Sequence, residues 1–199
     1  MTSSLTLRHK LFLVLVIAAL IIADQVSKWW VIEAFFRPRN FDATEAALDF
    51  WPWLVTLGQT QMPPIRIEVT SFFDLVMAWN TGVSFSMFAS DHDFMPYVLS
   101  AIALTLAAVF GVWFWRTTIL FTALPLALII AGALSNVWDR VRFKAVADFL
   151  YFHIGQYGWP AFNIADSCIV LGVALLAFDS LFLEPKRHKL REGHAHETQ

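Results

Sequence analysis

Long apolar stretches separated by short polar ones run along most of this chain. A helix needs about 20 predominantly apolar residues to cross a bilayer. Residues 94–115 and 117–138 contain no Asp, Glu, Lys or Arg and are joined by a very short turn at Arg116. Residues 11–32 and 162–183 are similarly apolar, although each contains charged side chains. The pattern predicts four transmembrane helices.

The segment between the first two spans predicts a different kind of structure. Residues 37–64 contain four prolines and scattered charges, which indicate an irregular insertion or a short interfacial helix. Residues 65–79 are rich in β-branched and aromatic side chains with partial alternation, a pattern typical of short strands. The run Asn80-Thr81-Gly82 then predicts a turn. We expect a membrane all-α fold with a small extracytoplasmic β-sheet, or cradle, and a short interfacial helix between helices 1 and 2.

The length of 199 residues permits one domain. We expect a single four-helix membrane domain over residues 1–185, with outer segments at about 33–93 and 139–161. We expect residues 186–199 to form a basic, disordered tail. An even number of spans places both termini on one side, and the basic residues at both ends predict that this side is the cytoplasm.

Composition supports the membrane class. Hydrophobic residues make up 58% of the chain and charged residues 15%, whereas soluble domains have about 45–50% and about 25%. Nine tryptophans, many near the ends of apolar runs, suit the lipid headgroup region. The net charge is -2 and no basic patch with interleaved aromatic residues is present, so we expect no nucleic-acid partner.

The beginning of the chain permits a second interpretation. Arg8 and Lys10, followed by the apolar residues 11–23, resemble the head and core of a cleaved signal peptide. The sequence after Ala23 is a poor cleavage context, and the apolar pattern continues to Ile32. These two features favour a first transmembrane helix.

Polar side chains near the ends of the spans are the main indication of function. Ionisable groups at membrane depth cost roughly 2.5–3.5 kcal/mol on insertion scales, so they usually have a partner or a function. Asp24 and Lys28 are four residues apart and lie on one helical face, where they can form a salt bridge or bind a ligand. Ser27 and Lys28 are adjacent and point about 100° apart, which disfavours a Ser–Lys nucleophile.

A second polar face ends the third span. Asn136, Asp139 and Arg140 have helical spacing, and the Arg140 guanidinium can hold a carboxylate or a peptide carbonyl. Solvation of a helix end is the simpler interpretation of Arg140. The small residues Gly132 and Ser135 just before this face permit the close approach of another helix.

The third polar group precedes the fourth span. Asn163 and Asp166 have the spacing of a helix capping box, which is a purely structural role. Asp148 lies at the other end of the same short outer loop, so the carboxylates of Asp148 and Asp166 meet if the loop folds back. Two adjacent carboxylates share a proton, and such a pair can activate water and cut a peptide. Zinc-binding spacings and phosphate-binding glycine loops are missing from the sequence, so we expect no metal or cofactor, and His153 is more typical of a structural histidine.

Five motifs resemble those of the lipoprotein signal peptidase (signal peptidase II) family and occur in the family's order. They span the chain from about residue 11 to 183. The motifs are Asp24-Gln-Val-Ser-Lys28, Asn80-Thr-Gly-Val-Ser-Phe-Ser86, Gly132-Ala-Leu-Ser-Asn136-Val-Trp-Asp139-Arg140, Val146-Ala-Asp148-Phe149 and Pro160-Ala-Phe-Asn163-Ile-Ala-Asp166-Ser167.

The resemblance implies an aspartic endopeptidase of the bacterial inner membrane, with its active site near the extracytoplasmic face. Its substrates would be prolipoproteins that carry a diacylglyceryl-modified cysteine, cut on the N-terminal side of that cysteine. It further implies that Asp148 and Asp166 are catalytic. The residues implied to bind or orient the substrate are Asp24, Lys28, Asn80, Gly82, Asn136, Asp139, Arg140 and Asn163. We expect a monomer in contact with membrane lipid.

The sequence departs from the family pattern in places. Ala131 and Ser135 replace glycines of the third motif, and residues 37–64 form a longer outer segment than the family needs. Two other functions stay open: a transporter or proton carrier that uses the buried carboxylates as a relay, and a lipid-binding scaffold without catalysis. The acidic residues cluster near one membrane face, which favours the peptidase over a relay.

Overall fold

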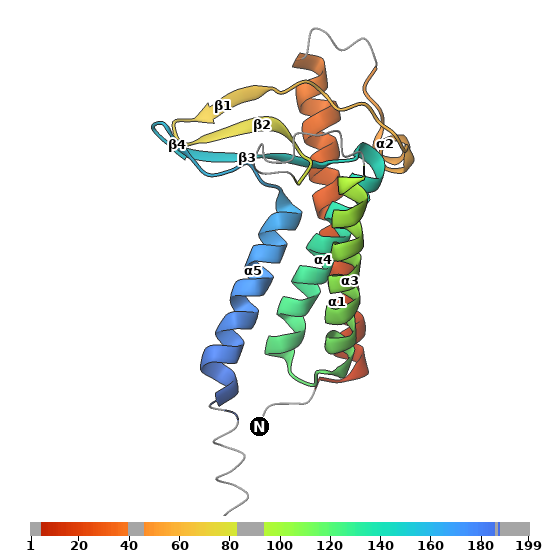
Figure 1. The fold of residues 1–199 in the computed structure, drawn as a ribbon, viewed down its shortest axis with the longest axis vertical. Helices are drawn as coiled ribbons and strands as arrows, with labels where there is room; N and C mark the ends of the chain where they lie inside the picture. Colours follow the sequence, from red (N-terminus) through yellow and green to blue (C-terminus); the bar gives the residue numbers. More distant parts are fainter. Residues whose placement is uncertain (1–4, 40–45, 83–93, 186, 188–199) are drawn as a thin grey trace, which may run out of the picture.

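The computed structural model describes residues 5–39, 46–82, 94–185 and 187. Four long helices lie beneath a small antiparallel sheet (Figure 1). The first begins as α1 (Leu7–Trp29) and continues through a π-helical stretch, η1 (Trp30–Phe36), and a 3₁₀ turn, η2 (Arg37–Arg39). The others are α3 (Met95–Arg116), α4 (Leu120–Phe143) and α5 (Ile164–Phe178), which continues as the π-helical η4 (Asp179–Leu183).

Local sequence signals set the ends of these helices. Pro96 lies in the first turn of α3, where a missing N–H costs nothing. Lys144 ends α4 in the left-handed conformation with a φ of 57°. Each of the four helices is long and apolar enough to cross a membrane. The first runs further outward than its apolar pattern, to Arg39, so its last turns stand above the span.

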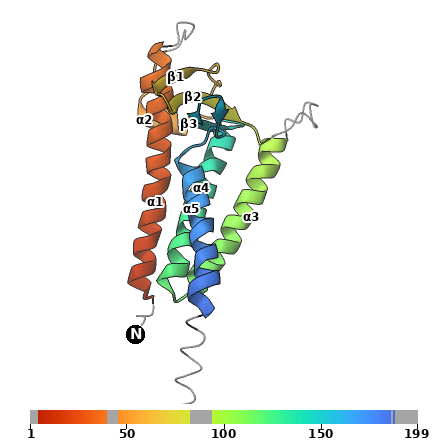
Figure 2. The ribbon, with the colours of Figure 1, turned by 90° about the vertical axis from the view of Figure 1, so that its left-hand side faces the viewer.

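The helix α4 lies at the centre of the bundle (Figure 2). In its most apolar window 72% of residues are buried, against 17% in each of the other three helices. Two glycines permit close packing between α4 and α5. A Cβ on Gly132 would lie 2.3 Å from the Ala165 carbonyl oxygen, and one on Gly172 would lie 2.8 Å from the Pro125 carbonyl oxygen. The apolar residues exposed on the outer helices suit a lipid environment.

The sheet has the order β1-β2-β3-β4 with antiparallel neighbours. Its strands are β1 (Arg66–Thr70), β2 (Phe73–Asn80), β3 (Val146–Ile154) and β4 (Tyr157–Gly158). Strands β1 and β2 confirm the pattern of residues 65–79. The small sheet expected beside the helices is present, and β3 and β4, which complete it, come from the outer segment between α4 and α5.

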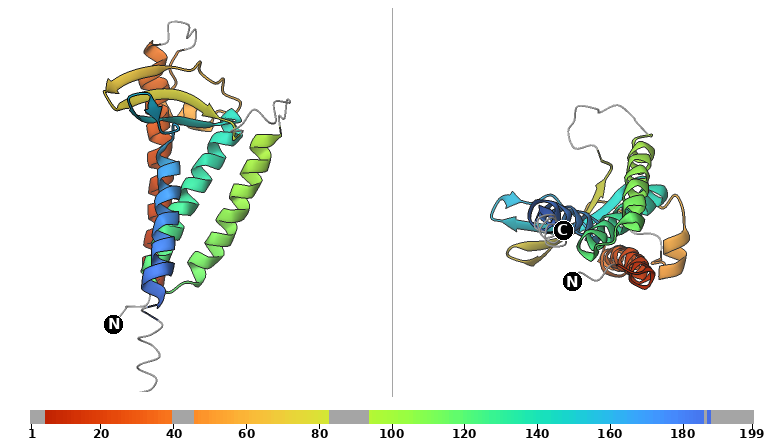
Figure 3. Two further views of the ribbon diagram at one scale, coloured as in Figure 1. Left: turned by 60° about the vertical axis from the view of Figure 1, so that its left-hand side comes forward. Right: turned by 90° about the horizontal axis from the view of Figure 1, so that it is seen from below.

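The sheet lies across one end of the bundle, and α1 begins and α5 ends at the opposite end (Figures 1 and 3). A short helix, α2 (Phe50–Val55), lies in the segment before the sheet, as expected. One apolar core joins α2, the outer part of the first helix, the end of α4 and the sheet. Its buried members are Val31, Ile32, Phe36, Trp53, Met62, Met77, Phe143, Ala147 and Phe149.

The close contact between α4 and α5 generates a stability prediction. The substitution Gly132→Ala places a methyl group against backbone atoms of α5 and should destabilise the protein by about 1–3 kcal/mol. The matched control is Gly111→Ala on α3, where a Cβ meets nothing within 4 Å. Thermal unfolding in detergent measures both. Equal midpoints for the two variants would contradict the packing argument.

Candidate functional site

Asn163 joins the two carboxylates at the outer end of the bundle. It is the N-cap of α5: its Oδ1 accepts a hydrogen bond from the Asp166 N–H at 2.9 Å, and Asp166 Oδ2 accepts one from the Asn163 N–H at 3.3 Å. The capping box expected from the spacing is therefore present. Asn163 Nδ2 also donates to Asp148 Oδ1 at 2.7 Å. The structural and the site interpretations of Asn163 are therefore compatible.

Asp148 lies on β3 and is only 2% exposed. Burial, followed by the negative charge of Asp166, raises the pKa of Asp148 from 3.8 to about 7. Hydrogen bonds from Asn80 and Asn163 and the positive charge of Lys28 act in the opposite direction but are outweighed. Near neutral pH this carboxyl group is therefore poised between its protonated and ionised forms.

Asp166 lies in the first turn of α5 and is half-buried. Its Oδ1 accepts a hydrogen bond of 2.7 Å from Asn136 Nδ2 on α4. The same asparagine lies beside Asn163, with 3.4 Å between Asn163 Nδ2 and Asn136 Oδ1. The two carboxylates are thus held by a chain of carboxamides, one carboxylate buried and the other partly accessible.

Lys28 is the buried cation below this pair. Its ammonium lies 2.7 Å from Asp24 Oδ2 and 2.7 Å from Asp139 Oδ2, and 3.4 Å from Asn136 Oδ1. Asp24 in turn accepts hydrogen bonds from Ser135 Oγ at 2.6 Å and from the Ala165 N–H at 2.9 Å. The i,i+4 salt bridge expected from the sequence is present, and it also links α1 to α4 and α5.

Arg140 and Asn80 lie at the rim of the site. Arg140 Nη1 donates to the Asn136 carbonyl at 3.4 Å, and its buried Nε has no hydrogen-bond partner among the described residues. Asn80 Oδ1 accepts from the Gly82 N–H at 2.9 Å, which closes the turn predicted there. Gly82 has a φ of 82°, and a Cβ at this position would overlap Leu99. The rest of this motif, residues 83–86, lies outside the described residues.

Other candidate residues have structural contacts. Ser27 Oγ donates to the Asp24 carbonyl at 2.7 Å, within its own helix. His153 lies on the sheet, with Nε2 3.3 Å from Asp74 Oδ1. Among the described residues, no three His, Cys, Asp or Glu side chains converge as metal ligands would.

Sequence reasoning missed two buried polar residues beside Asp139. Gln25 Nε2 donates to Asp139 Oδ1 at 2.9 Å, and Arg142 Nη2 donates to Gln25 Oε1 at 2.7 Å. Gln25 stands inside the first motif, and Arg142 follows Arg140 by two positions. The available signal was the presence of these two polar residues within apolar helices, but the burial of both depends on segments distant in the chain.

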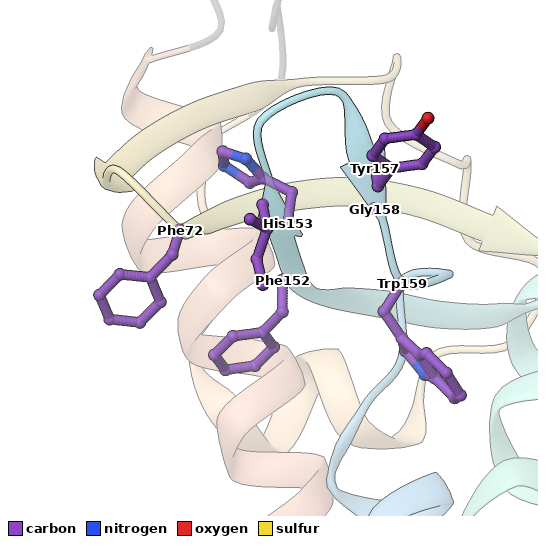
Figure 4. Close-up of a pocket in the computed structure, with 7 residues that line it drawn as sticks. Phe72, Phe152, His153, Tyr157, Gly158 and Trp159 are labelled. Carbon is purple, nitrogen blue, oxygen red and sulfur yellow. The ribbon is translucent and has the colours of Figure 1, made fainter.

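An open aromatic groove lies at the far end of the sheet (Figure 4). The side chains of Phe72, Phe152 and Trp159 point to the side of the sheet where the helices lie. Trp159 is 70% exposed, and Phe152 stacks on Phe162 with ring centroids 5.9 Å apart. Phe152 is four residues beyond Asp148 on β3 and therefore shares its face of the strand. An exposed apolar surface thus extends from the site along the sheet.

The raised pKa of Asp148 has a consequence for stability. Between pH 3.8 and about 7 the folded protein retains a proton that the unfolded chain has released. The free energy of unfolding should therefore fall as pH rises through this window, by a few kcal/mol in total. Chemical unfolding in detergent at several pH values measures this slope, which should be flatter in Asp148→Asn. Equal slopes in the two proteins would contradict the assignment.

Comparison with known proteins gives a consistent result. The sequence model of the family described as "Signal peptidase (SPase) II" matches residues 16–182. The lipoprotein signal peptidase of Methylocella silvestris is 38% identical over 168 residues, which cover 84% of each chain. That of Sphingopyxis alaskensis is 44% identical over 135 residues, covering 67% of this chain and 78% of the relative.

Solved structures agree at the level of the fold. A bacterial membrane enzyme solved at 1.9 Å resolution has a TM-score of 0.62 and 24% identity, and the match covers 92% of this chain and 98% of the other. The family match covers all the residues of the site described above. The chain therefore belongs to the signal peptidase II family and is a multi-pass membrane peptidase.

Proposed function

We propose that this protein is an aspartic endopeptidase that removes the signal peptide from diacylglyceryl-modified prolipoproteins, cutting on the N-terminal side of the lipidated cysteine. The observation that carries the proposal is the pairing of Asp148 and Asp166 through Asn163, with the pKa of Asp148 raised to about 7. The names of the relatives support the substrate class.

The two carboxylates divide the acid and base roles. Burial favours Asp148 as the proton donor, and Asp166, held by Asn136, acts as the base. Asp166 takes a proton from a water molecule as the water oxygen attacks the scissile carbonyl carbon, and Asp148 donates its proton to the carbonyl oxygen. Collapse of the tetrahedral intermediate breaks the C–N bond: the proton held by Asp166 moves to the departing amine, and one hydroxyl of the intermediate returns a proton to Asp148 as the carbonyl re-forms. No covalent intermediate is needed.

The remaining polar residues orient the substrate. The buried Nε of Arg140 has no acceptor in the part of the chain that the structure describes, and it is suited to a peptide carbonyl of the substrate. Asn80 and Gly82 lie at the end of β2, beyond Val76, the last residue of β2 that is paired with β1, so an extended substrate backbone can lie beside this end of the strand. Lys28, Asp24 and Asp139 lie behind the asparagines and hold them in place. We expect the protein to act as a monomer.

The distribution of charges supports an inner-membrane location with cytoplasmic termini. Arg8, Lys10, Arg116 and Arg187 all lie at the end of the bundle opposite the sheet, and such basic flanks are typical of the cytoplasmic side. Two of the arginines at the sheet end are neutralised by carboxylates: Arg37 by Glu33 and Arg66 by Asp74. The sheet and the site then face the extracytoplasmic side. The aromatic groove, which contains Tyr157 and Trp159, then lies at the lipid–water boundary, where Trp and Tyr rings are favoured.

Conservative amide substitutions test the catalytic pair. Asp148→Asn and Asp166→Asn should each lower cleavage of a lipidated precursor by at least about 100-fold, because neither variant can exchange the proton. Release of the signal peptide is measured by mass spectrometry in detergent. The matched control is Glu68→Gln on β1, an exposed carboxylate of the same sheet, which should cleave normally.

The same assay separates the alternatives. Normal cleavage by Asp148→Asn would overturn the proposal. Binding of the precursor by the unmodified protein without loss of mass would indicate a lipid-binding scaffold. Proton uptake into vesicles without cleavage would indicate a carrier, although Ser100 and Thr105 within α3 bond to carbonyls of their own helix and offer no relay.

A further inference from the structure

Arg142 is a fully buried arginine outside the residues assigned to the reaction. Its side chain is 0% exposed, and it lies on α4 one residue before the helix ends. Nη1 donates to the Trp53 carbonyl at 3.0 Å, and Nη2 donates to Gln25 Oε1 at 2.7 Å and lies 3.5 Å from Asp139 Oδ1. A buried guanidinium is tolerated only when it is paired in this way.

The partner Trp53 lies in α2, within the outer segment between the first helix and β1. The Arg142 guanidinium lies over the Trp53 ring, 4.0 Å from its centroid, and Trp53 is itself fully buried. The same segment bonds the end of α4 twice more: the Gly58 N–H donates to the Arg142 carbonyl at 3.0 Å, and Gln61 Nε2 donates to the Phe143 carbonyl at 2.9 Å. Residues 46–62 thus pack against the end of α4.

Asp139 connects this contact to the catalytic pair. Its Oδ1 faces Gln25 and Arg142, and its Oδ2 lies 2.7 Å from Lys28 Nζ and accepts from the Ala147 N–H at 3.3 Å. Ala147 directly precedes Asp148 on β3. Lys28 also contacts Asn136, whose Nδ2 holds Asp166. The orientation of one carboxylate, Asp139, therefore affects the surroundings of both catalytic candidates.

We propose that Arg142 is a positioning residue of the peptidase and that the α2 segment, residues 46–62, is a buttress that holds it. Arg142 touches neither the substrate nor the reacting water; it acts through Asp139. The inference rests on the proposed function and adds to it a role for the long outer segment. Lysine cannot replace this arginine, because one ammonium cannot reach the three acceptors and cover the Trp53 ring together.

The test is the kinetics of Arg142→Lys with the lipidated precursor. We expect kcat to fall by about 10–100-fold, as displacement of catalytic groups by about 1 Å does, and KM to change less than twofold. The substitution should also move Lys28 away from Asp148. Because the charge of Lys28 lowers the pKa of Asp148, this pKa should then rise, and the basic limb of the pH–rate profile should move to higher pH. The matched control is Arg66→Lys: Arg66 also pairs with a carboxylate and lies over an aromatic ring, Tyr151, but on the sheet away from Asp139.

A second variant keeps the test decisive if Arg142→Lys folds poorly. Trp53→Leu removes the ring but keeps the backbone carbonyl that Arg142 contacts, so it should lower kcat by less than Arg142→Lys does. In the double variant the two losses should be less than multiplicative, because both act through one contact. Thermal unfolding in detergent gives the folded fraction used to correct each kcat.

Two results separate the inference from the proposed function. Unchanged kcat and pH profile in folded Arg142→Lys, with Asp148→Asn inactive, would overturn the role of Arg142 alone. A loss that vanishes after correction for the folded fraction would also overturn it, since the role would be purely structural. Full activity of Asp148→Asn would instead remove the proposed function itself.

Discussion

The buried ammonium group of Lys28 is the interaction on which the outer end of this bundle depends. It lies between the carboxylates of Asp24 and Asp139, and all three side chains are almost completely buried. Removing one partner of such a cluster leaves an uncompensated charge and typically costs about 3–5 kcal/mol. Asp24 also accepts a hydrogen bond from the Ala165 N–H, so the cluster holds α1, α4 and α5 together at this end of the bundle. The site is built directly above it.

Asn163 connects the two acidic residues of the candidate catalytic site. Its side chain caps α5 through one atom and holds Asp148 through another, so the geometry of a helix terminus also sets the separation of two acids. The cap is stable on its own, and the pair of carboxylates is not, because two adjacent negative charges repel each other. A proton on Asp148, whose pKa is raised to about 7 by burial and by the charge of Asp166, relieves this repulsion near neutral pH.

The surroundings of the site divide into two regions with different physical roles. Towards α1 and α4, the α2 segment adds a dry aromatic core around Trp53 and Phe143 and brings Arg142 to Asp139. Along the sheet, the exposed rings of Phe152 and Trp159 form an apolar surface on the side where the helices lie. One region resists movement, and the other leaves a surface on which an acylated peptide can lie.

The sequence by itself determined the features that depend on bilayer thickness or on contacts within one or two turns. These are the four spans, the strands at 65–79, the capping box of Asn163 and the pairing of Asp24 with Lys28. Strand β3 was expected only as a loop, since its pairing with β2 joins residues about 70 positions apart. Arg142 had no predicted role, and only the packing of Trp53 against it decided its burial. The tertiary structure alone brought Asp139 to Lys28 and Asp148 to Asn163, because these contacts form only when the helices and the sheet have packed together.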